Sequence, residues 1–243
     1  AGPCMRRQGG ATLQFAMVPM NLLGAGDRAG YVVSGTWGKK AFSDGAGFGG
    51  YVAWTGNDSG FTTMPAPGEL EIEEGSRYLH VTSNETIGGI RMVDFPDTDV
   101  PLVNDMSSDY LARPIDWRLY DIVYGGVQKN LAPAGMALVF VRKSAVEDRP
   151  ELGAYLRYAT HVEGDSLANT PPMFQVYLMG KVLRHLEERA NDVPRVEIFD
   201  SAQLGLALGQ TNVIHAALTK GAAAQSALDK GLRLARFLAS EER

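Results

Sequence analysis

The sequence predicts an α/β fold with a mostly parallel central sheet and helices on its faces. Strand-like apolar runs alternate with glycine turns and helix-compatible segments, an order that is typical of parallel sheets. The length of 243 residues and the hydrophobic content of 45% suffice for one large core, with room for a small appendage. The runs that predict strands are Tyr31–Val33, Tyr78–Thr82, Pro101–Val103, Ile122–Tyr124 and Met136–Arg142.

The first eight residues are expected to form a poor strand. They contain a proline, a glycine and two arginines, and proline and glycine weaken strands. We therefore expect the sheet to lack an edge at this end. Gly9 and Gly10 then lead into the largely apolar residues 13–18, which we expect to form the first turns of a helix.

A glycine-rich stretch at residues 45–50 fits the pattern G-x-G-x-x-G. A dinucleotide-binding loop with that pattern needs a strand before it and a helix after it. Here the helix-like residues 39–42 come before and the strand-like residues 51–54 follow, so the order is reversed. The stretch is therefore expected to be a helix-to-strand connection.

Three candidate site residues follow strand-like runs. Lys129 comes after an apolar run and two glycines, Asp105 after residues 100–103, and Trp37 after residues 31–36. We expect the lysine to be partly desolvated at the mouth of a pocket, which favours the neutral, nucleophilic amine. A solvated surface lysine is the alternative, and it is the commoner one for this spacing. A lysine, a carboxylate and a flat apolar ring are what a pyridoxal phosphate site requires.

Seven collinear motifs make the chain similar to a known family. The motifs are Gly9–Pro19, Gly35–Trp37, Thr82–Ile90, Asp105–Ser108, Arg113–Asp116, Gln128–Gly135 and Asn169–Pro172. On these motifs the chain resembles the phosphoserine aminotransferases, pyridoxal-phosphate enzymes of class V with the aspartate-aminotransferase fold. The resemblance covers residues 9–189 and implies a large-domain sheet truncated at both ends, with an antiparallel strand at residues 136–141.

The resemblance implies a role for each residue around the cofactor ring. Lys129 would bind the cofactor covalently and move the substrate proton. Asp105 would pair with the pyridinium nitrogen, which makes the ring an electron sink. Trp37 would stack on the ring, and Thr86 would donate a hydrogen bond to its phenolic oxygen. Without the resemblance, an ordinary core tryptophan and a strand-end threonine would be the expectation for the last two.

The resemblance also implies a phosphate site at the start of the first helix. Backbone N–H groups at a helix N-terminus bind phosphate without needing a basic side chain. Ala11 and Thr12 would supply amides, and Gln128 a side-chain donor. Asn169 and Thr170 would reach the phosphate of a neighbouring subunit's cofactor, so the active site would be completed in a homodimer.

Two functions from different classes remain open. The first is transamination between O-phospho-L-serine and 2-oxoglutarate, a step of serine biosynthesis, with pyridoxal 5'-phosphate as cofactor. The second is a truncated or chimeric product that keeps the cofactor-site residues without turnover. The resemblance assigns residues 9–190 to part of the transferase large domain. Ala132 departs from it, because the family usually has a glycine there.

The C-terminal part departs more completely, and we expect residues 195–243 to be an appended segment. Residues 174–189 have helical spacing. A short strand at 196–199 and alanine-rich helices are expected to follow, with an apolar packing stripe through Leu228, Leu232, Ala235 and Leu238. Residues 199–218 resemble the end of bacterial YlxR-like nucleic-acid-binding proteins, although six basic and five acidic residues nearly cancel across 195–243.

Composition agrees with a cytoplasmic α/β enzyme, and the resemblance implies small amino and keto acids as its substrates. The net charge of −5 argues against nucleic-acid binding as the main function. The lone Cys4 excludes an internal disulfide framework, and the four histidines lack the spacing of a zinc site. No apolar stretch approaches the ~20 residues of a membrane span, and no export signal opens the chain.

Overall fold

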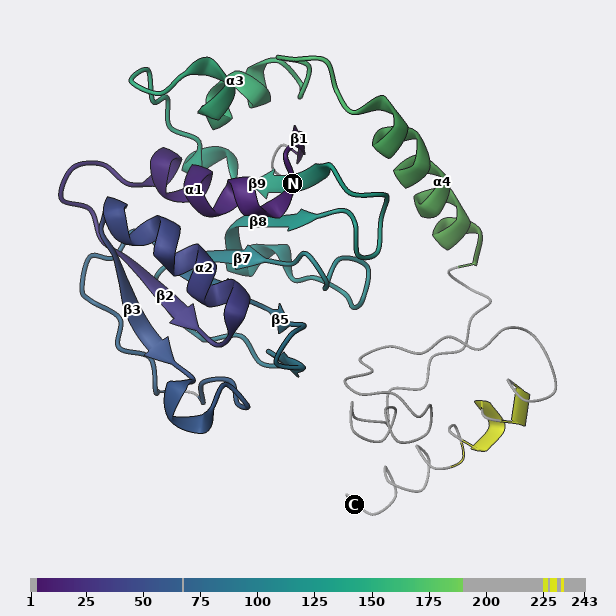
Figure 1. Cartoon of the computed structure of the whole chain (residues 1–243), viewed down its shortest axis with the longest axis horizontal. Helices are drawn as coiled ribbons and strands as arrows, with labels where there is room; N and C mark the ends of the chain where they lie inside the picture. The colour runs from purple at the N-terminus through teal and green to yellow at the C-terminus, as the bar shows by residue number, and fades with distance from the viewer. Residues whose placement is uncertain (1–3, 67, 190–224, 227, 231–232, 234–243) are drawn as a thin grey trace. The chain divides into compact units, whose positions relative to one another are not determined.

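The computed structural model is built on a seven-stranded sheet with the strand order β1-β9-β8-β7-β4-β2-β3 (Figure 1). Strands β3, β2, β4, β7 and β8 run parallel, whereas β9 is antiparallel to β8 and β1 is antiparallel to β9. This arrangement confirms the mostly parallel sheet and the antiparallel strand after Lys129. The strands are β1 (Cys4–Gln8), β2 (Ala29–Val33), β3 (Gly50–Thr55), β4 (Leu79–Thr82), β7 (Leu102–Asp105), β8 (Tyr120–Gly126) and β9 (Met136–Val141).

The structure describes residues 4–66, 68–189, 225–226, 228–230 and 233. The chain divides into two compact units, residues 1–183 and 184–243, and the sheet belongs to the first. The strand predicted at 196–199, the YlxR-like stretch 199–218 and most of the alanine-rich segment lie outside the described residues. Those predictions remain untested.

Two long helices, α1 (Gly10–Leu22) and α2 (Thr36–Gly45), cover one face of the sheet (Figure 1). Strand alternation sends Tyr31 and Val33 to that face, where they share a core with Phe15, while Val32 joins the core on the opposite face. Burying one such apolar side chain contributes about 1.5–3 kcal/mol. The first turns of α4 (Met173–Arg189) supply Met179 to the opposite core.

The expectation of a poor N-terminal strand is wrong. Residues 4–8 form β1 and pair antiparallel with the stretch of β9 from Phe140 to Met136. The backbone pairing offered by β9 outweighs the low strand propensity of the segment. Strand alternation then turns Met5 and Arg7 inward, and each is only 1% exposed. The amide of Gly9 also donates to the carbonyl of Gly135 at 3.3 Å, so the glycine loop is anchored on both sides.

The remaining elements connect the main strands. A short 3-10 turn, Ala46–Phe48, links α2 to β3, which confirms the helix-to-strand connection in the glycine-rich stretch. A small hairpin of β5 (Asn84–Glu85) and β6 (Ile90–Arg91) follows β4, and the sequence did not predict it. The other short elements are α3 (Tyr158–Glu163) and 3-10 turns at Asn57–Ser59, Trp117–Leu119, Lys143–Ala145 and Ala154–Leu156.

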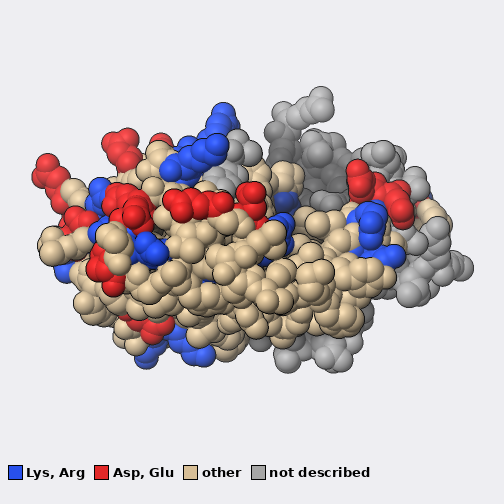
Figure 2. Space-filling view, turned by 90° about the horizontal axis from the view of Figure 1, so that it is seen from above, with Lys and Arg blue, Asp and Glu red and all other residues tan. Residues whose placement is uncertain are grey.

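The described surface carries charges of both signs. Figure 2 shows acidic and basic side chains in mixed clusters on one face, separated by uncharged surface. Exposed ion pairs such as Arg28–Glu73 and Arg77–Glu147 contribute to this mixture. Among the helices of the described part of the chain, none is long and apolar enough to cross a membrane.

Candidate functional site

A cavity of about 390 Å³ lies at the carboxyl ends of β4 and β7, beside the segment that follows β8. Figure 1 shows the arrowheads of β7 and β8 pointing toward this edge of the sheet. The volume falls in the range of small-molecule sites, and the carboxyl edge is where open α/β sheets bind ligands. Seven predicted site residues line the cavity, namely Ala11, Thr12, Trp37, Thr86, Asp105, Gln128 and Lys129.

The N-terminus of α1 forms one wall. Gly9 has a φ of 108° and Gly10 a φ of 73°, left-handed values that glycine adopts without strain. The first turn of α1 has neither a side-chain cap nor an acidic residue, and its first residues line the cavity. Its free N–H groups and positive helix end are therefore open to an anion, as the sequence predicted.

Asp105 ends β7 on the floor of the cavity and is 4% exposed. Its Oδ1 accepts hydrogen bonds from Ser107 N at 2.9 Å and Ser107 Oγ at 2.6 Å. Its Oδ2 accepts no hydrogen bond from the residues that the structure describes. Burial raises the pKa of Asp105 to about 6, although the bonds from Ser107 and the charge of Lys129 oppose this shift. A buried acid with a free oxygen and a raised pKa is suited to bind a cation.

Ser107 also holds the segment that carries Lys129. Its Oγ accepts a hydrogen bond from Gly126 N at 3.1 Å. A Cβ on Gly125 would lie 2.9 Å from the backbone of Ser107, so only glycine lets the end of β8 approach this closely. Gly125 thus has a packing reason, and Ser107 connects the acid to the lysine segment through Gly126.

Lys129 lines the cavity but is exposed to solvent. The expectation that the strand end and the glycine turn would partly desolvate its amine is therefore wrong. The turn places the segment after Gly126 at the rim, where both Gln128 and Lys129 are exposed. Among the described residues that line the cavity, Lys129 has the only basic side chain and Asp105 the only acidic one.

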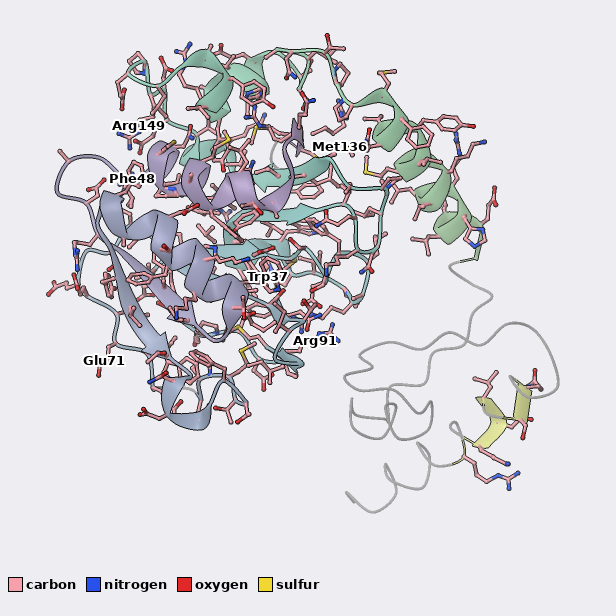
Figure 3. The ribbon with its side chains drawn as sticks, in the orientation of Figure 1. Trp37, Phe48, Glu71, Arg91, Met136 and Arg149 are labelled. Atoms are coloured by element: carbon pink, nitrogen blue, oxygen red, sulfur yellow. The ribbon has the colours of Figure 1, made fainter. Side chains whose placement is uncertain are left out.

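Trp37 and Thr86 form the opposite wall. Figure 3 shows Trp37 at the N-terminal end of α2. Its Nε1 donates to Thr86 Oγ1 at 3.2 Å, and its backbone N donates to Glu85 Oε2 at 3.0 Å. Glu85 is fully buried, and burial raises its pKa while the amides of Gly38 and Trp37 lower it. Glu85 was not among the predicted site residues, because its partners Trp37 and Gly38 lie 48 and 47 residues away in the chain.

Asn169 and Thr170 do not line the cavity. Asn169 is half-buried and donates to Gln8 Oε1 at 3.4 Å, and Thr170 is exposed. The fold therefore brings seven of the nine predicted residues together and leaves these two apart. Both are polar residues on the segment before α4, open to contacts from outside the described chain.

The cavity also contains polar residues that the sequence analysis did not select. Thr82 and Asn84 are 2% and 4% exposed, and their atoms Thr82 Oγ1 and Asn84 Oδ1 have no hydrogen-bond partner within the described part of the chain. Buried polar atoms without partners are costly, so a ligand that bonds to them would stabilise the site. The sequence could have indicated both residues, because Thr82 ends a strand and Asn84 follows two residues later. No group of three His, Cys, Asp or Glu residues suited to a metal occurs among the described residues.

Comparison with known proteins agrees with this geometry. The sequence pattern of the family described as aminotransferase class-V matches residues 8–201. The chain belongs to the class-V aminotransferase family. It is 47% identical over 182 residues to the phosphoserine aminotransferase of Dichelobacter nodosus, covering 74% of this chain and 51% of that protein.

Solved structures of several aminotransferases are similar in fold. The phosphoserine aminotransferase from Bacillus circulans subsp. alkalophilus has a TM-score of 0.75 at 45% identity, covering 77% of this chain and 53% of that one. The pyridoxal-phosphate-bound enzyme from Trichomonas vaginalis has a TM-score of 0.70 at 32% identity, covering 76% and 53%. An aspartate aminotransferase from Thermus thermophilus, 20% identical with a TM-score of 0.60, shares the fold. These matches confirm the predicted family and the aspartate-aminotransferase-like fold.

This class-V aminotransferase chain spans about half the length of the curated relatives it matches, 51% in the case of the Dichelobacter protein. The family match covers all seven cavity residues that the sequence predicted, from Ala11 to Lys129. The match also contains Asn169 and Thr170. The chemistry of these residues is therefore the basis for a functional proposal.

Proposed function

We propose that this chain carries the cofactor site of a pyridoxal-phosphate-dependent aminotransferase. Its reaction would move an amino group between O-phospho-L-serine and 2-oxoglutarate, a cytoplasmic step of serine biosynthesis. One observation carries the proposal: a single cavity is lined by Lys129, Asp105, Trp37 and the uncapped start of α1. The phosphoserine aminotransferases among its relatives suggest the substrate pair.

Asp105 would hold the pyridine nitrogen. Pyridoxal phosphate, when bound, supplies an electron sink for charge that develops on the substrate. A protonated ring nitrogen would face the free Oδ2, while Ser107 keeps the carboxylate in place through Oδ1. The positive charge would lower the pKa of Asp105 and keep it ionised, which reverses the effect of burial.

The start of α1 would bind the phosphate. The amides of Ala11 and Thr12 lie in the first turn of the helix, and both residues line the cavity. Gln128 at the rim would add a side-chain donor. The helix end contributes about 0.3–1 kcal/mol of favourable electrostatic energy toward an anion, and up to ~2 kcal/mol where it is partly buried.

Lys129 would act at the open rim of the cavity, where it is exposed. Its amine would hold the cofactor through the aldehyde carbon, with the aldehyde oxygen leaving as water, and once free again it would accept and return the substrate proton. A bound cofactor would supply the desolvation that the chain alone does not give this amine. Trp37 would stack on the ring, and Thr86 would bond to the ring oxygen.

A homodimer is part of the proposal. Asn169 and Thr170 would bond to the phosphate of the partner's cofactor, since they lie outside their own cavity. Replacing both residues by alanine should then weaken cofactor binding and leave the free protein folded. If the double variant binds pyridoxal phosphate as tightly as the parent chain, the shared site is wrong.

An absorbance titration with pyridoxal phosphate tests the proposal. We expect a visible band that is present in the parent protein and absent in Lys129→Ala, because among the described residues that line the cavity only Lys129 has an amine that can bond covalently to the aldehyde. Lys143→Ala provides the matched control, since Lys143 lies in a 3-10 turn and does not line the cavity. A parent protein without the band would remove the cofactor claim.

A second addition separates turnover from binding alone. O-phospho-L-serine should convert the band to that of the amine form of the cofactor, and L-serine should do so far less. A band that forms but does not respond to phosphoserine would favour the alternative, a chain that binds the cofactor without turnover.

A further inference from the structure

Glu85 is a buried acid that caps a helix from a distant part of the chain. Its Oε2 accepts from Trp37 N at 3.0 Å and its Oε1 from Gly38 N at 2.7 Å. Helix α2 itself begins after Gly35, which provides no side-chain cap. A carboxylate at this place satisfies free N–H groups and complements the positive end of the helix.

The glycines around Glu85 make room for this contact. A Cβ on Gly35 would lie 2.7 Å from the Glu85 carboxylate, and one on Gly38 would lie 2.8 Å from the carbonyl oxygen of Val32. Real side chains essentially never approach so closely, so both positions require glycine. The start of α2 is therefore shaped to receive an acid.

The neighbours of Glu85 in sequence face the other way. Asn84 and Thr86 line the cavity, whereas Glu85 does not, as strand alternation requires. Thr86 Oγ1 accepts from the indole Nε1 of Trp37 at 3.2 Å. One short segment thus holds Trp37 at two points, its backbone through Glu85 and its ring through Thr86.

A cation completes the surroundings of the indole. Lys40 Nζ lies 4.6 Å from the centre of the Trp37 ring. Lys40 does not line the cavity, although Trp37 does. The ring is therefore restrained by a backbone cap, a hydrogen bond at its edge and a charge over its face.

We propose that Glu85 is a positioning residue that fixes the start of α2 and thereby sets the orientation of the Trp37 ring toward a ligand in the cavity. The identity of that ligand as pyridoxal phosphate rests on the proposed function. The effect of Glu85 on the orientation of Trp37 in the free protein is independent of the proposed function.

The first experiment needs no cofactor. In a background with Trp54→Phe and Trp117→Phe, Trp37 is the single source of indole fluorescence. We expect Glu85→Gln to raise the acrylamide quenching of Trp37, because the amide cannot accept both backbone bonds. Asp27→Asn is the matched control, since Asp27 Oδ2 also accepts a backbone amide, from Gly24, but at the opposite end of β2. Equal quenching in Glu85→Gln and the parent would overturn the inference.

The second experiment is a double-mutant cycle on pyridoxal phosphate affinity. Glu85→Gln should weaken binding by about 5- to 30-fold where the ~1–2 kcal/mol of a lost helix cap has to be restored on binding to bring the ring back into position. In a Trp37→Phe background the same change should have little further effect, because the ring it positions is gone. Additive effects would mean that Glu85 acts on general stability, which would overturn the positioning role.

The two experiments separate the inference from the proposed function. A parent protein that does not bind pyridoxal phosphate refutes the function, while the quenching result still decides the role of Glu85. If Glu85→Gln does not fold, Glu85→Asp carries the same tests, because it keeps the charge and shortens its reach. An unchanged Trp37 in a folded Glu85→Asp protein would then count against the inference.

Discussion

Two buried aspartates, four positions apart, have opposite surroundings. Asp109 is 1% exposed and lies between two guanidinium groups, at 3.1 Å from Arg91 Nε and 3.0 Å from Arg113 Nη2. Asp105 is 4% exposed and, among the described residues, is hydrogen-bonded to Ser107 alone. The described part of the chain therefore compensates the first charge with two ion pairs, whereas Asp105 forms no ion pair there and is opposed only by the charge of Lys129.

The difference indicates a structural role for Asp109 and a ligand-binding role for Asp105. Asp109 joins β6 to the turn that follows β7, because Arg91 and Arg113 come from these two segments. Asp105 faces a cavity, and its pKa is raised to about 6 by burial. A carboxylate is retained in such a place when a bound group supplies the missing positive charge.

Removal of Asp109 should have the largest effect. Asp109→Ala leaves two guanidinium groups without their acid, and breaking a buried pair costs about 3–5 kcal/mol. We expect the lower end of this range, since Arg91 and Arg113 are 29% and 22% exposed. Urea unfolding measures the loss. Glu73→Gln is the control, because its exposed pair with Arg28 should contribute little, and a comparable loss in both variants would break the comparison.

Asp105 should instead make the free protein less stable as the pH rises. Its folded pKa of about 6 lies above its ordinary value of 3.8, so the folded state binds more protons between these values. Stability is then fully present below about pH 4 and is lost as the pH passes 6. The difference corresponds to about 3 kcal/mol, at about 1.4 kcal/mol per pKa unit.

The variant Asp105→Asn tests whether Asp105 causes this decrease of stability with rising pH. The amide keeps an oxygen for Ser107 and cannot ionise, so the variant should be more stable than the parent above pH 6 and similar to it near pH 4. Glu85, whose pKa burial also raises, should leave part of the slope. Saturating pyridoxal phosphate should flatten the slope of the parent protein. A parent protein whose stability does not change across this range would contradict the assignment.

Much of the site could be predicted because its residues stand at strand ends. Asp105 ends β7, Trp37 begins α2 after β2, and Lys129 follows the glycines that end β8. Parallel strands bring such ends to one edge, and the collinear motifs indicated which ends matter. Glu85 could not be found in this way, because its role depends on the backbone of Trp37, which lies 48 residues earlier in the chain.

The failures have physical causes as well. The expected burial of Lys129 assumed that a glycine turn alone would cover the amine, yet the turn leaves it at the rim. The N-terminal strand was missed because its propensity is low, whereas β9 offers a full row of backbone partners. That strand buries Arg7, a charge whose surroundings sequence patterns do not reveal.

Arg7 extends the comparison to a buried charge that, within the described part of the chain, has no partner acid and does not line the cavity. Its Nη2 donates to the carbonyl of Tyr155 at 2.6 Å, and its guanidinium lies 4.4 Å from the centre of the Tyr155 ring. Its Nε and Nη1 have no partner among the described residues, and burial lowers its pKa.

Arg7→Met should therefore stabilise the protein by about 1–2 kcal/mol, because replacing a poorly compensated buried charge by an apolar side chain of similar length is often favourable. Urea unfolding of Arg7→Met beside Arg6→Met checks this, since Arg6 points the other way on β1. If Arg7→Met is instead destabilising, then the ring of Tyr155 and one carbonyl suffice to compensate a buried cation, and the lack of a close cation around Asp105 would be weaker evidence for a ligand.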